Sequence, residues 1–229
     1  MPLDVLMRYI PIIDFIQNSG IPQPTILEVG SGPNGITTYL KRKVVGLDLD
    51  FPVQPSPYLE PRVGSATALP FSDRSFDFVV STDTLEHIPV EDRARALSEM
   101  CRVARLAVVC GVPCGKVTQE YERRFNEKWR EVHDVTHCYL DEHEKFGLPE
   151  ADEMLRLAEQ LGRDHGFGRV WAIKNVNLEF WYYYRINELR TDPPILYHEL
   201  REFATNNPLL FTKCNSWGDC YRHIFFLAR

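Results

Sequence analysis

Residues 26–40, ILEVGSGPNGITTYL, restrict the possible folds of this chain more than any other stretch. The short apolar run at 25–30 is typical of a buried strand in a parallel sheet. Gly30 and Gly32 follow at once and permit a tight turn and a close approach of the backbone to a ligand. Residues 34–40 then predict a helix. A strand, a glycine turn and a helix in this order indicate the first unit of an α/β fold, with a ligand site at the turn.

The same alternation continues through residue 112. We expect strands at 43–50, 62–66, 75–82 and 105–112 and a helix at 90–104. Strands alternating with crossovers predict a parallel sheet covered by helices on both faces. Ligands of such sheets bind at the carboxyl ends of the strands.

The second half has a different character. Residues 114–149 are polar, without a clear strand, and residues 177–215 are aromatic-rich and predicted to be helical. A helix is expected at 150–162, ended by Gly162, with strands at 168–176 and 219–229. We therefore expect a single domain over 1–229, with a cofactor-binding half (1–112) and a substrate-side half (113–229). The stretches 114–149 and 177–215 are predicted to be lid-like insertions after strands five and six.

Composition narrows the range of partners. The chain has 229 residues and a formal net charge of −6, and no basic stripe is present. Nucleic-acid binding is not expected, because phosphate contacts normally require such a stripe. The sequence has neither a signal-peptide pattern nor an apolar run that could span a bilayer, and its six cysteines form no CxxC pair. A cytoplasmic protein with reduced thiols and a small-molecule substrate is expected. The oligomeric state is left open.

The glycine turn admits two adenosine cofactors. Gly30, Gly32 and Gly35 fit the GxGxxG spacing of dinucleotide sites, and Asp48 ends the next strand at the distance of a ribose-binding carboxylate. Glu28, however, places a negative charge two residues before the turn. A pyrophosphate would be repelled by that charge, whereas an amino or sulfonium group would be attracted. This favours S-adenosylmethionine over NAD, and an NAD-dependent oxidoreductase is the less favoured alternative.

Longer motifs carry a resemblance to a known family. The run E-x-G-x-G at 28–32, GLDLD at 46–50 and GSATALPFSDRSFDFVVSTDTLEHIP at 64–89 resemble the class I S-adenosylmethionine-dependent methyltransferases, in particular their type 11-like small-molecule branch. The resemblance implies a Rossmann-like, mostly parallel seven-stranded sheet with an antiparallel last strand. It also implies S-adenosylmethionine as cofactor and methyl transfer to a small molecule, at oxygen or nitrogen.

The resemblance further implies a cofactor site at the ends of the first four strands: Glu28, Gly30, Ser31, Gly32, Asp48, Leu49, Ser65, Ala66, Ser81 and Thr82. Asp48 would bind the ribose hydroxyls and Leu49 would pack on the adenine. Ser65 and Pro33 depart from the family pattern. Ser65 replaces the usual aspartate, and Pro33 removes one N–H from the turn. These departures keep open a non-catalytic cofactor-binding partner subunit as an alternative.

The catalytic residues are less evident, because methyl transfer mainly requires alignment of the acceptor. Three histidines are candidates for a base: His87, His137 and His143. Asp83, Glu86 and His87 resemble the E-x-x-E-H segment of the ubiquinone-pathway O-methyltransferases, and would share one helix face as metal ligands.

A second metal pattern, HxxxH, is formed by His133 and His137. We prefer a capping or pairing role for Glu86 and an exposed polar loop for residues 131–150, with a lid that carries a base as the alternative, so no metal is predicted. The aromatic run at 180–190 either lines an acceptor pocket or packs in a core. A weak likeness of HEKFGLP to methyltransferases encoded beside glycosyltransferases points to a sugar or envelope-related acceptor.

Overall fold

The computed structural model describes residues 3–229, and a seven-stranded sheet runs through its centre in the order β3-β2-β1-β4-β5-β7-β6. The strands are β1 (Ile26–Val29), β2 (Val44–Asp48), β3 (Leu59–Val63), β4 (Phe76–Thr82), β5 (Ala104–Pro113), β6 (Arg169–Asn177) and β7 (Cys220–Ala228). β7 lies between β5 and β6 and is antiparallel to both, whereas the pairs among β1 to β5 are parallel. The predicted Rossmann-like methyltransferase topology is therefore confirmed.

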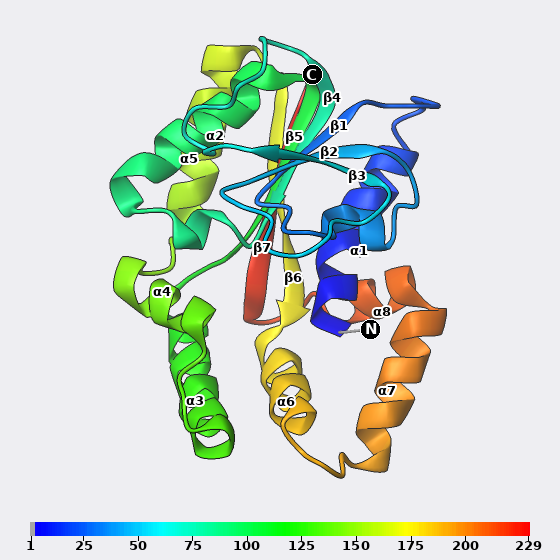
Figure 1. Ribbon diagram of the computed structural model, residues 1–229, viewed down its shortest axis with the longest axis vertical. Coiled ribbons are helices and arrows are strands. Elements are labelled where there is room, and N and C mark those ends of the chain that lie inside the picture. Colours follow the sequence, from blue (N-terminus) through cyan, green and yellow to red (C-terminus); the bar gives the residue numbers. More distant parts are fainter. Residues whose placement is uncertain (1–2) are drawn as a thin grey trace.

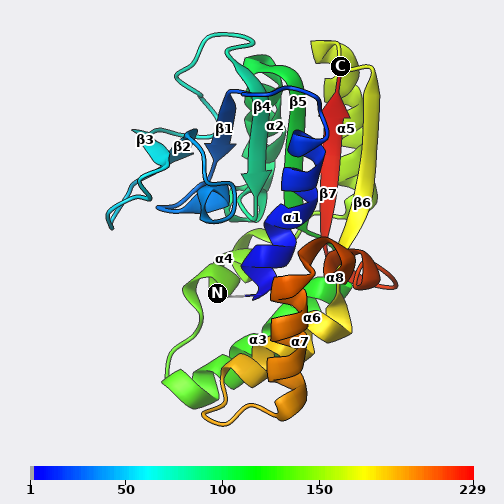
Figure 2. The ribbon, with the colours of Figure 1, turned by 90° about the vertical axis from the view of Figure 1, so that its right-hand side faces the viewer.

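Helices cover both faces of this sheet (Figure 2). Helix α1 (Leu3–Gln17) and the short 3₁₀ turn η1 (Gly35–Thr38) lie on one face, where Ile12, Ile16 and Ile36 pack against the strands. Helices α2 (Val90–Val103) and α5 (Ala151–His165) lie on the other, with Leu97 and Ala158 fully buried. Burial of these two apolar faces provides most of the driving force for this arrangement.

Two helical insertions lie below the carboxyl ends of the parallel strands (Figure 1). Helices α3 (Lys116–His133) and α4 (Cys138–Phe146) follow β5, and helices α6 (Leu178–Glu188), α7 (Ile195–Asn206) and α8 (Pro208–Cys214) follow β6. A third hydrophobic cluster joins them through Phe125, Trp181 and Tyr197. The start of α1 contributes Leu3, so this helix connects the insertions to the sheet.

Three predicted elements differ from the structure. The helix expected at 34–40 is only the four-residue turn η1, and its first residue, Gly35, has a positive φ of 48° that an α-helix does not allow. The third strand lies at 59–63 rather than 62–66. It is an edge strand in which only Leu59 is buried, so it carries little apolar signal.

The third difference is the end of α5. The helix continues past Gly162 to His165 and stops at Gly166, whose φ is +76°. Gly162 lies inside the helix. A glycine is needed at this position because a Cβ there would come within 2.7 Å of Val170 on β6. Its role is close helix–strand packing rather than helix termination.

The six cysteines are free, and four of them, Cys101, Cys110, Cys114 and Cys220, are buried. None of the helices between residues 3 and 229 combines the length and apolarity needed to cross a bilayer.

Candidate functional site

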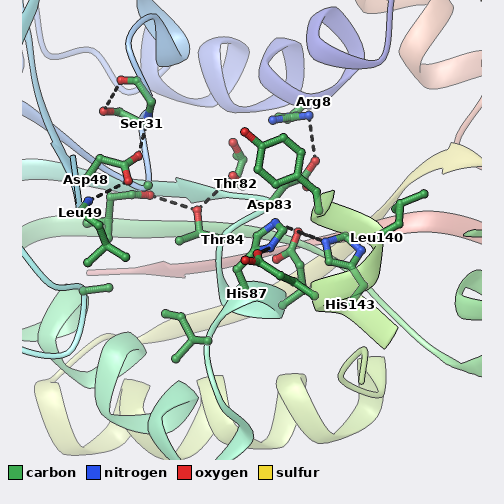
Figure 3. A pocket seen from close by; sticks show the side chains of 18 of the residues that line it. Arg8, Ser31, Asp48, Leu49, Thr82, Asp83, Thr84, His87, Leu140 and His143 are labelled. Carbon is green, nitrogen blue, oxygen red and sulfur yellow. Dashed lines mark hydrogen bonds and ion pairs between the residues drawn. The ribbon is translucent and has the colours of Figure 1, made fainter. Parts of the chain in front are cut away.

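A cavity of about 910 Å³ opens at the carboxyl ends of β1, β2 and β4 and extends to the insertion helices. Asp48 and Leu49 lie at one end, and His87 and His143 lie at the other (Figure 3). Most of the residues predicted from sequence line it: Gly30, Ser31, Gly32, Asp48, Leu49, Ser65, Ala66, Thr82, His87, His137 and His143. The predicted cofactor end and the predicted catalytic histidines thus share one space.

The glycine turn uses its two central glycines differently. A Cβ on Gly30 would lie 2.1 Å from Oγ1 of Thr84, which is in the loop after β4. This close contact requires glycine at position 30. Gly32 has a φ of +54° and no atom within 4 Å of its would-be Cβ. Gly32 is therefore the point at which the backbone itself faces the cavity and can approach a ligand closely.

Asp48 fixes this turn while facing the cavity. One carboxylate oxygen accepts the backbone N–H of Gly32 at 2.7 Å, and the other accepts the N–H of Leu49 at 2.8 Å. Leu49 follows with 73% of its side chain exposed at the cavity wall. A carboxylate beside an exposed apolar side chain suits a ligand with both hydroxyls and a flat apolar ring.

Two residues of the predicted cofactor set do not line the cavity. Glu28 is fully buried beneath the turn, where its carboxylate accepts the N–H of Ile36 at 2.7 Å. Burial raises the pKa of Glu28 to about 7. A Cβ on Gly35 would come within 2.0 Å of this carboxylate. Ser81 is likewise 1% exposed, and its hydroxyl has no hydrogen-bond partner.

The far end of the cavity contains a cluster of ionisable side chains. Glu86 and His87 lie on the short 3₁₀ turn η2 (Leu85–His87), and His143 comes from α4 in the first insertion. Nε2 of His143 lies 3.3 Å from Nε2 of His87 and 3.9 Å from a carboxylate oxygen of Glu86. Glu86 is fully buried, and neither of its oxygens has a hydrogen-bond partner among residues 3–229.

Each histidine ring is oriented by a carboxylate on its other nitrogen. Nδ1 of His143 lies 2.9 Å from Oε1 of Glu122, which also accepts the hydroxyl of Tyr221 at 2.7 Å. Nδ1 of His87 lies 2.6 Å from Oε2 of Glu142. Both Nε2 atoms are consequently turned toward one another and toward Glu86.

Burial and neighbouring charges shift the protonation of this cluster. Burial, reinforced by the charge of Asp83, raises the pKa of Glu86 to about 8. Burial and the nearby His143 lower the pKa of His87. Burial would also lower the pKa of His143, but the bond to Glu122 and the other carboxylates outweigh it, and the pKa is raised.

The metal set considered from sequence, Asp83 with Glu86 and His87, is not assembled. Asp83 has a positive φ of 48° and turns away from its neighbours, because the segment after β4 is not a continuous helix. Its carboxylate instead forms a bidentate ion pair with Arg222 of β7 and lies 3.0 Å from the guanidinium of Arg8 on α1. The charge of Arg222 and of Arg8 lowers the pKa of Asp83 to about 2, against the effect of burial.

The two histidines of the HxxxH pair lie in different surroundings. His133 is exposed and packs against Trp129 with ring centroids 4.0 Å apart, whereas His137 lines the cavity. Within residues 3–229, the one group of three possible metal ligands is Glu86, His87 and His143.

Aromatic side chains form the wall between the two insertions. Trp181 and Tyr221 stack with ring centroids 4.4 Å apart and line the cavity together with Phe125. In the run at 180–190, Trp181 thus lines the cavity, whereas Tyr184 packs in the third cluster. Sequence reasoning missed Arg8, Glu122 and Tyr221, because no local pattern links positions so far apart in the chain.

Comparisons with known proteins point to methyltransferases. A family model described as a methyltransferase domain matches residues 27–107. A search of curated proteins finds no match. Among solved structures, a putative methyltransferase from an antibiotic biosynthesis pathway of Anabaena variabilis matches with a TM-score of 0.55 at 18% identity, over 98% of this chain and 100% of that chain.

Two further structures are similar. A possible histamine N-methyltransferase from Thermotoga maritima has a TM-score of 0.53 at 18% identity, with 97% of this chain and 91% of that chain covered. Phosphoethanolamine N-methyltransferase 2 of Haemonchus contortus, in complex with phosphomonomethylethanolamine and S-adenosylhomocysteine, has a TM-score of 0.51 at 18% identity. That match covers 94% of this chain and 52% of the other.

Proposed function

Since the chain is a class I S-adenosylmethionine-dependent methyltransferase, we propose that it methylates a hydroxyl oxygen of a small, ring-shaped molecule. One observation carries the proposal: a single cavity joins the turn at Gly32 and Asp48 to the polar cluster of Glu86, His87 and His143. A methyl donor at the first end and an acceptor at the second would be held together within one cavity.

The cofactor end has the features that S-adenosylmethionine requires. The carboxylate of Asp48 offers acceptors for ribose hydroxyls, and exposed Leu49 offers an apolar surface for the adenine. The backbone at Gly32 has room for a ligand because nothing occupies the position of a Cβ there. When bound, S-adenosylmethionine supplies an electrophilic methyl group.

The acceptor end favours a ring. Trp181 and Tyr221 present stacked aromatic groups to the cavity, and Phe125 extends the wall. Flat apolar walls of this kind bind the face of an aromatic ring or the apolar face of a sugar. The tightly packed third cluster holds these rings in place, so the acceptor would be oriented by a rigid surface.

Oxygen is favoured over nitrogen by the polar cluster. A hydroxyl must lose its proton as it attacks, whereas a neutral amine attacks through a free lone pair. Glu86, His87 and His143 bring imidazole nitrogens and a carboxylate to the acceptor end, where a hydroxyl proton would be released. The neighbours named as N-methyltransferases act on amines, so nitrogen is the alternative that an assay must exclude.

The test is a methylation assay with the purified chain. Phenols, sugars and amines would be incubated with S-adenosylmethionine, and products identified by mass spectrometry with the methylated atom located by NMR. O-methylation of a phenol or a sugar supports the proposal and decides between the two ring classes. Methylation confined to amines would overturn it. Calorimetric titration with S-adenosylmethionine, S-adenosylhomocysteine and NAD is the parallel control for cofactor identity.

A further inference from the structure

The cluster at the acceptor end has an unusual arrangement of lone pairs. Glu122 and Glu142 occupy the Nδ1 atoms of His143 and His87, so each ring in its neutral form carries its proton on Nδ1. The two Nε2 atoms then hold lone pairs that face each other at 3.3 Å. The buried carboxylate of Glu86 faces the same point and has no hydrogen-bond partner.

Three electron-rich groups meeting in a buried place repel one another unless something positive lies between them. A single shared proton could relieve the contact between the histidines. Glu86 would then need a second proton of its own, because an unpaired buried carboxylate is costly. A divalent cation would satisfy all three groups at once.

We propose that Glu86, His87 and His143 bind a divalent transition-metal ion, with Nε2 of each imidazole and the Glu86 carboxylate as ligands. The three ligand atoms lie within 4.8 Å of one another. Glu86 and His87 come from the turn η2, and His143 comes from the insertion helix α4. Zn–N bonds of about 2.0–2.1 Å at a tetrahedral angle place two nitrogens about 3.3 Å apart. The observed separation of the Nε2 atoms is 3.3 Å.

The type of ligand selects the class of metal. Two imidazoles and one carboxylate suit zinc, manganese or iron, whereas calcium and magnesium prefer oxygen ligands alone. Three protein ligands leave a fourth position for water or an acceptor, and the cluster borders the cavity. The carboxylates of Glu122 and Glu142 on the Nδ1 atoms form the supporting contacts that metal-binding histidines usually have.

The inference deepens the proposed function, because a metal ion there would polarise an acceptor hydroxyl, and in this sense it rests on that proposal. Metal binding itself requires neither S-adenosylmethionine nor an acceptor. The full chain would be freed of metal with a chelator and titrated with Zn²⁺ by calorimetry and with Co²⁺ by visible absorption. We expect one ion per chain and a Co²⁺ spectrum of four- or five-coordinate geometry without thiolate bands.

Variants identify the ligands. His87→Gln and His143→Gln should each weaken Zn²⁺ binding by about a hundredfold or more, because each removes one of three ligands. Glu122→Gln, which alters only the supporting contact, should weaken it by about 10- to 100-fold. His133→Gln is the matched control, since His133 is an exposed histidine of the same helical insertion outside the cluster. It should bind Zn²⁺ as the unaltered chain does.

Circular dichroism of each variant checks that it is folded, and His87→Gln is the variant of choice if His143→Gln is not, because His87 is only partly buried. The proposal is overturned if the metal-free chain takes up no stoichiometric Zn²⁺ or Co²⁺, or if His87→Gln binds as tightly as the unaltered chain. Metal binding without O-methylation of any acceptor would contradict the proposed function alone. O-methylation that persists in metal-free protein showing no metal uptake would contradict the metal site alone.

Discussion

At the scale of single residues, Asp48 determines much of the cofactor end, because its two carboxylate oxygens hold the amides of Gly32 and Leu49. Each oxygen retains a lone pair for a ribose hydroxyl. We expect Asp48→Ala to weaken S-adenosylmethionine binding by more than about tenfold, since charge-assisted hydrogen bonds are lost. Calorimetry measures the change. Asp50→Ala, at the same cavity wall, is the matched control, and equal effects of the two changes would argue against a ribose role for Asp48.

A substitution at Ser65 is expected to strengthen cofactor binding, whereas Asp48→Ala is expected to weaken it. Its hydroxyl lies 2.9 Å from the hydroxyl of Thr67 and lines the cavity where the resemblance implies an adenine-binding aspartate. Ser65→Asp should strengthen S-adenosylmethionine binding by about three- to tenfold, because a carboxylate accepts an amino N–H more strongly than a hydroxyl does. Unchanged or weaker binding in the titration would mean that the adenine amino group lies elsewhere.

Glu28 predicts a pH dependence of stability. Its pKa is raised from 4.5 to about 7 in the folded protein by burial. The folded state therefore binds the proton more tightly, and stability is lost as pH rises from about 4.5 through 7. Glu28→Gln keeps an acceptor for the N–H of Ile36 but cannot ionise. Relative to the unaltered chain, it should gain about 3 kcal/mol in free energy of unfolding between pH 4.5 and 8. Urea unfolding at several pH values measures this gain, and a constant difference would refute it.

Residue roles were only partly predictable from the sequence. The positions of Gly30, Gly32 and Asp48 follow from a strand–turn pattern that is local in the chain. The direction of the Glu28 side chain cannot be predicted in this way. Side chains of a strand alternate between its two faces, and the sequence does not tell whether Glu28 faces the cavity or lies beneath the turn. The carboxylate that made S-adenosylmethionine preferable to NAD lies outside the cavity wall.

At the scale of elements, an ion-pair group joins three segments of the fold. Arg8 of α1 and Arg222 of β7 both contact Asp83, which directly follows β4. Arg222 is 1% exposed. Asp83→Asn leaves this guanidinium buried without a full counter-charge and should cost about 3–5 kcal/mol in free energy of unfolding. Chemical denaturation measures the loss.

The control for this change is Asp4→Asn. Asp4 lies 3.7 Å from Arg8 and is partly exposed, so its removal should cost less than about 1 kcal/mol. Because the pKa of Asp83 is lowered to about 2, its contribution is present above about pH 4 and is lost as pH falls toward 2. Equal losses for the two variants would show that the pair with Arg222 contributes little.

Helices and strands differ in how well their positions can be predicted from the sequence. Strands buried on both faces, such as β4 and β5, have continuous apolar runs and were located within a residue or two. The edge strand β3 has one buried residue and was misplaced by three positions. The turn η1 was expected to be a helix, because the sequence pattern does not reveal that Glu28 lies beneath Gly35 and fixes its backbone.

At the scale of the whole molecule, cofactor binding should be visible as stability. A ligand that binds only the folded state at 100 times its dissociation constant adds about 2.7 kcal/mol. For a domain of this size we expect S-adenosylmethionine to raise Tm by roughly 5–10 °C, and NAD at the same concentration to leave it unchanged. Differential scanning calorimetry measures both. A rise with NAD alone would contradict the cofactor assignment.

The two halves of the cavity differ in how far the sequence could predict them. The cofactor end is built from residues 30–84, each close to a recognisable motif. The acceptor end draws Arg8, His87, Glu122, His143 and Tyr221 from five elements spread over the chain. The packing of the first insertion, which carries Glu122 and His143, under the sheet brings them together, and no pattern within a single segment encodes that.

The position of β7 has a consequence for how the chain is made. β6 pairs only with β7 among the strands, and β7 also closes the free edge of β5. During synthesis, residues 1–219 can therefore form the sheet only as far as β5, with that edge open. β6 can join the sheet only after residues 220–228 have been made and β7 has formed. A ribosome-bound chain is expected to carry an unpaired β5 edge until residues 220–228 emerge, and this is the interval in which chaperones would protect it.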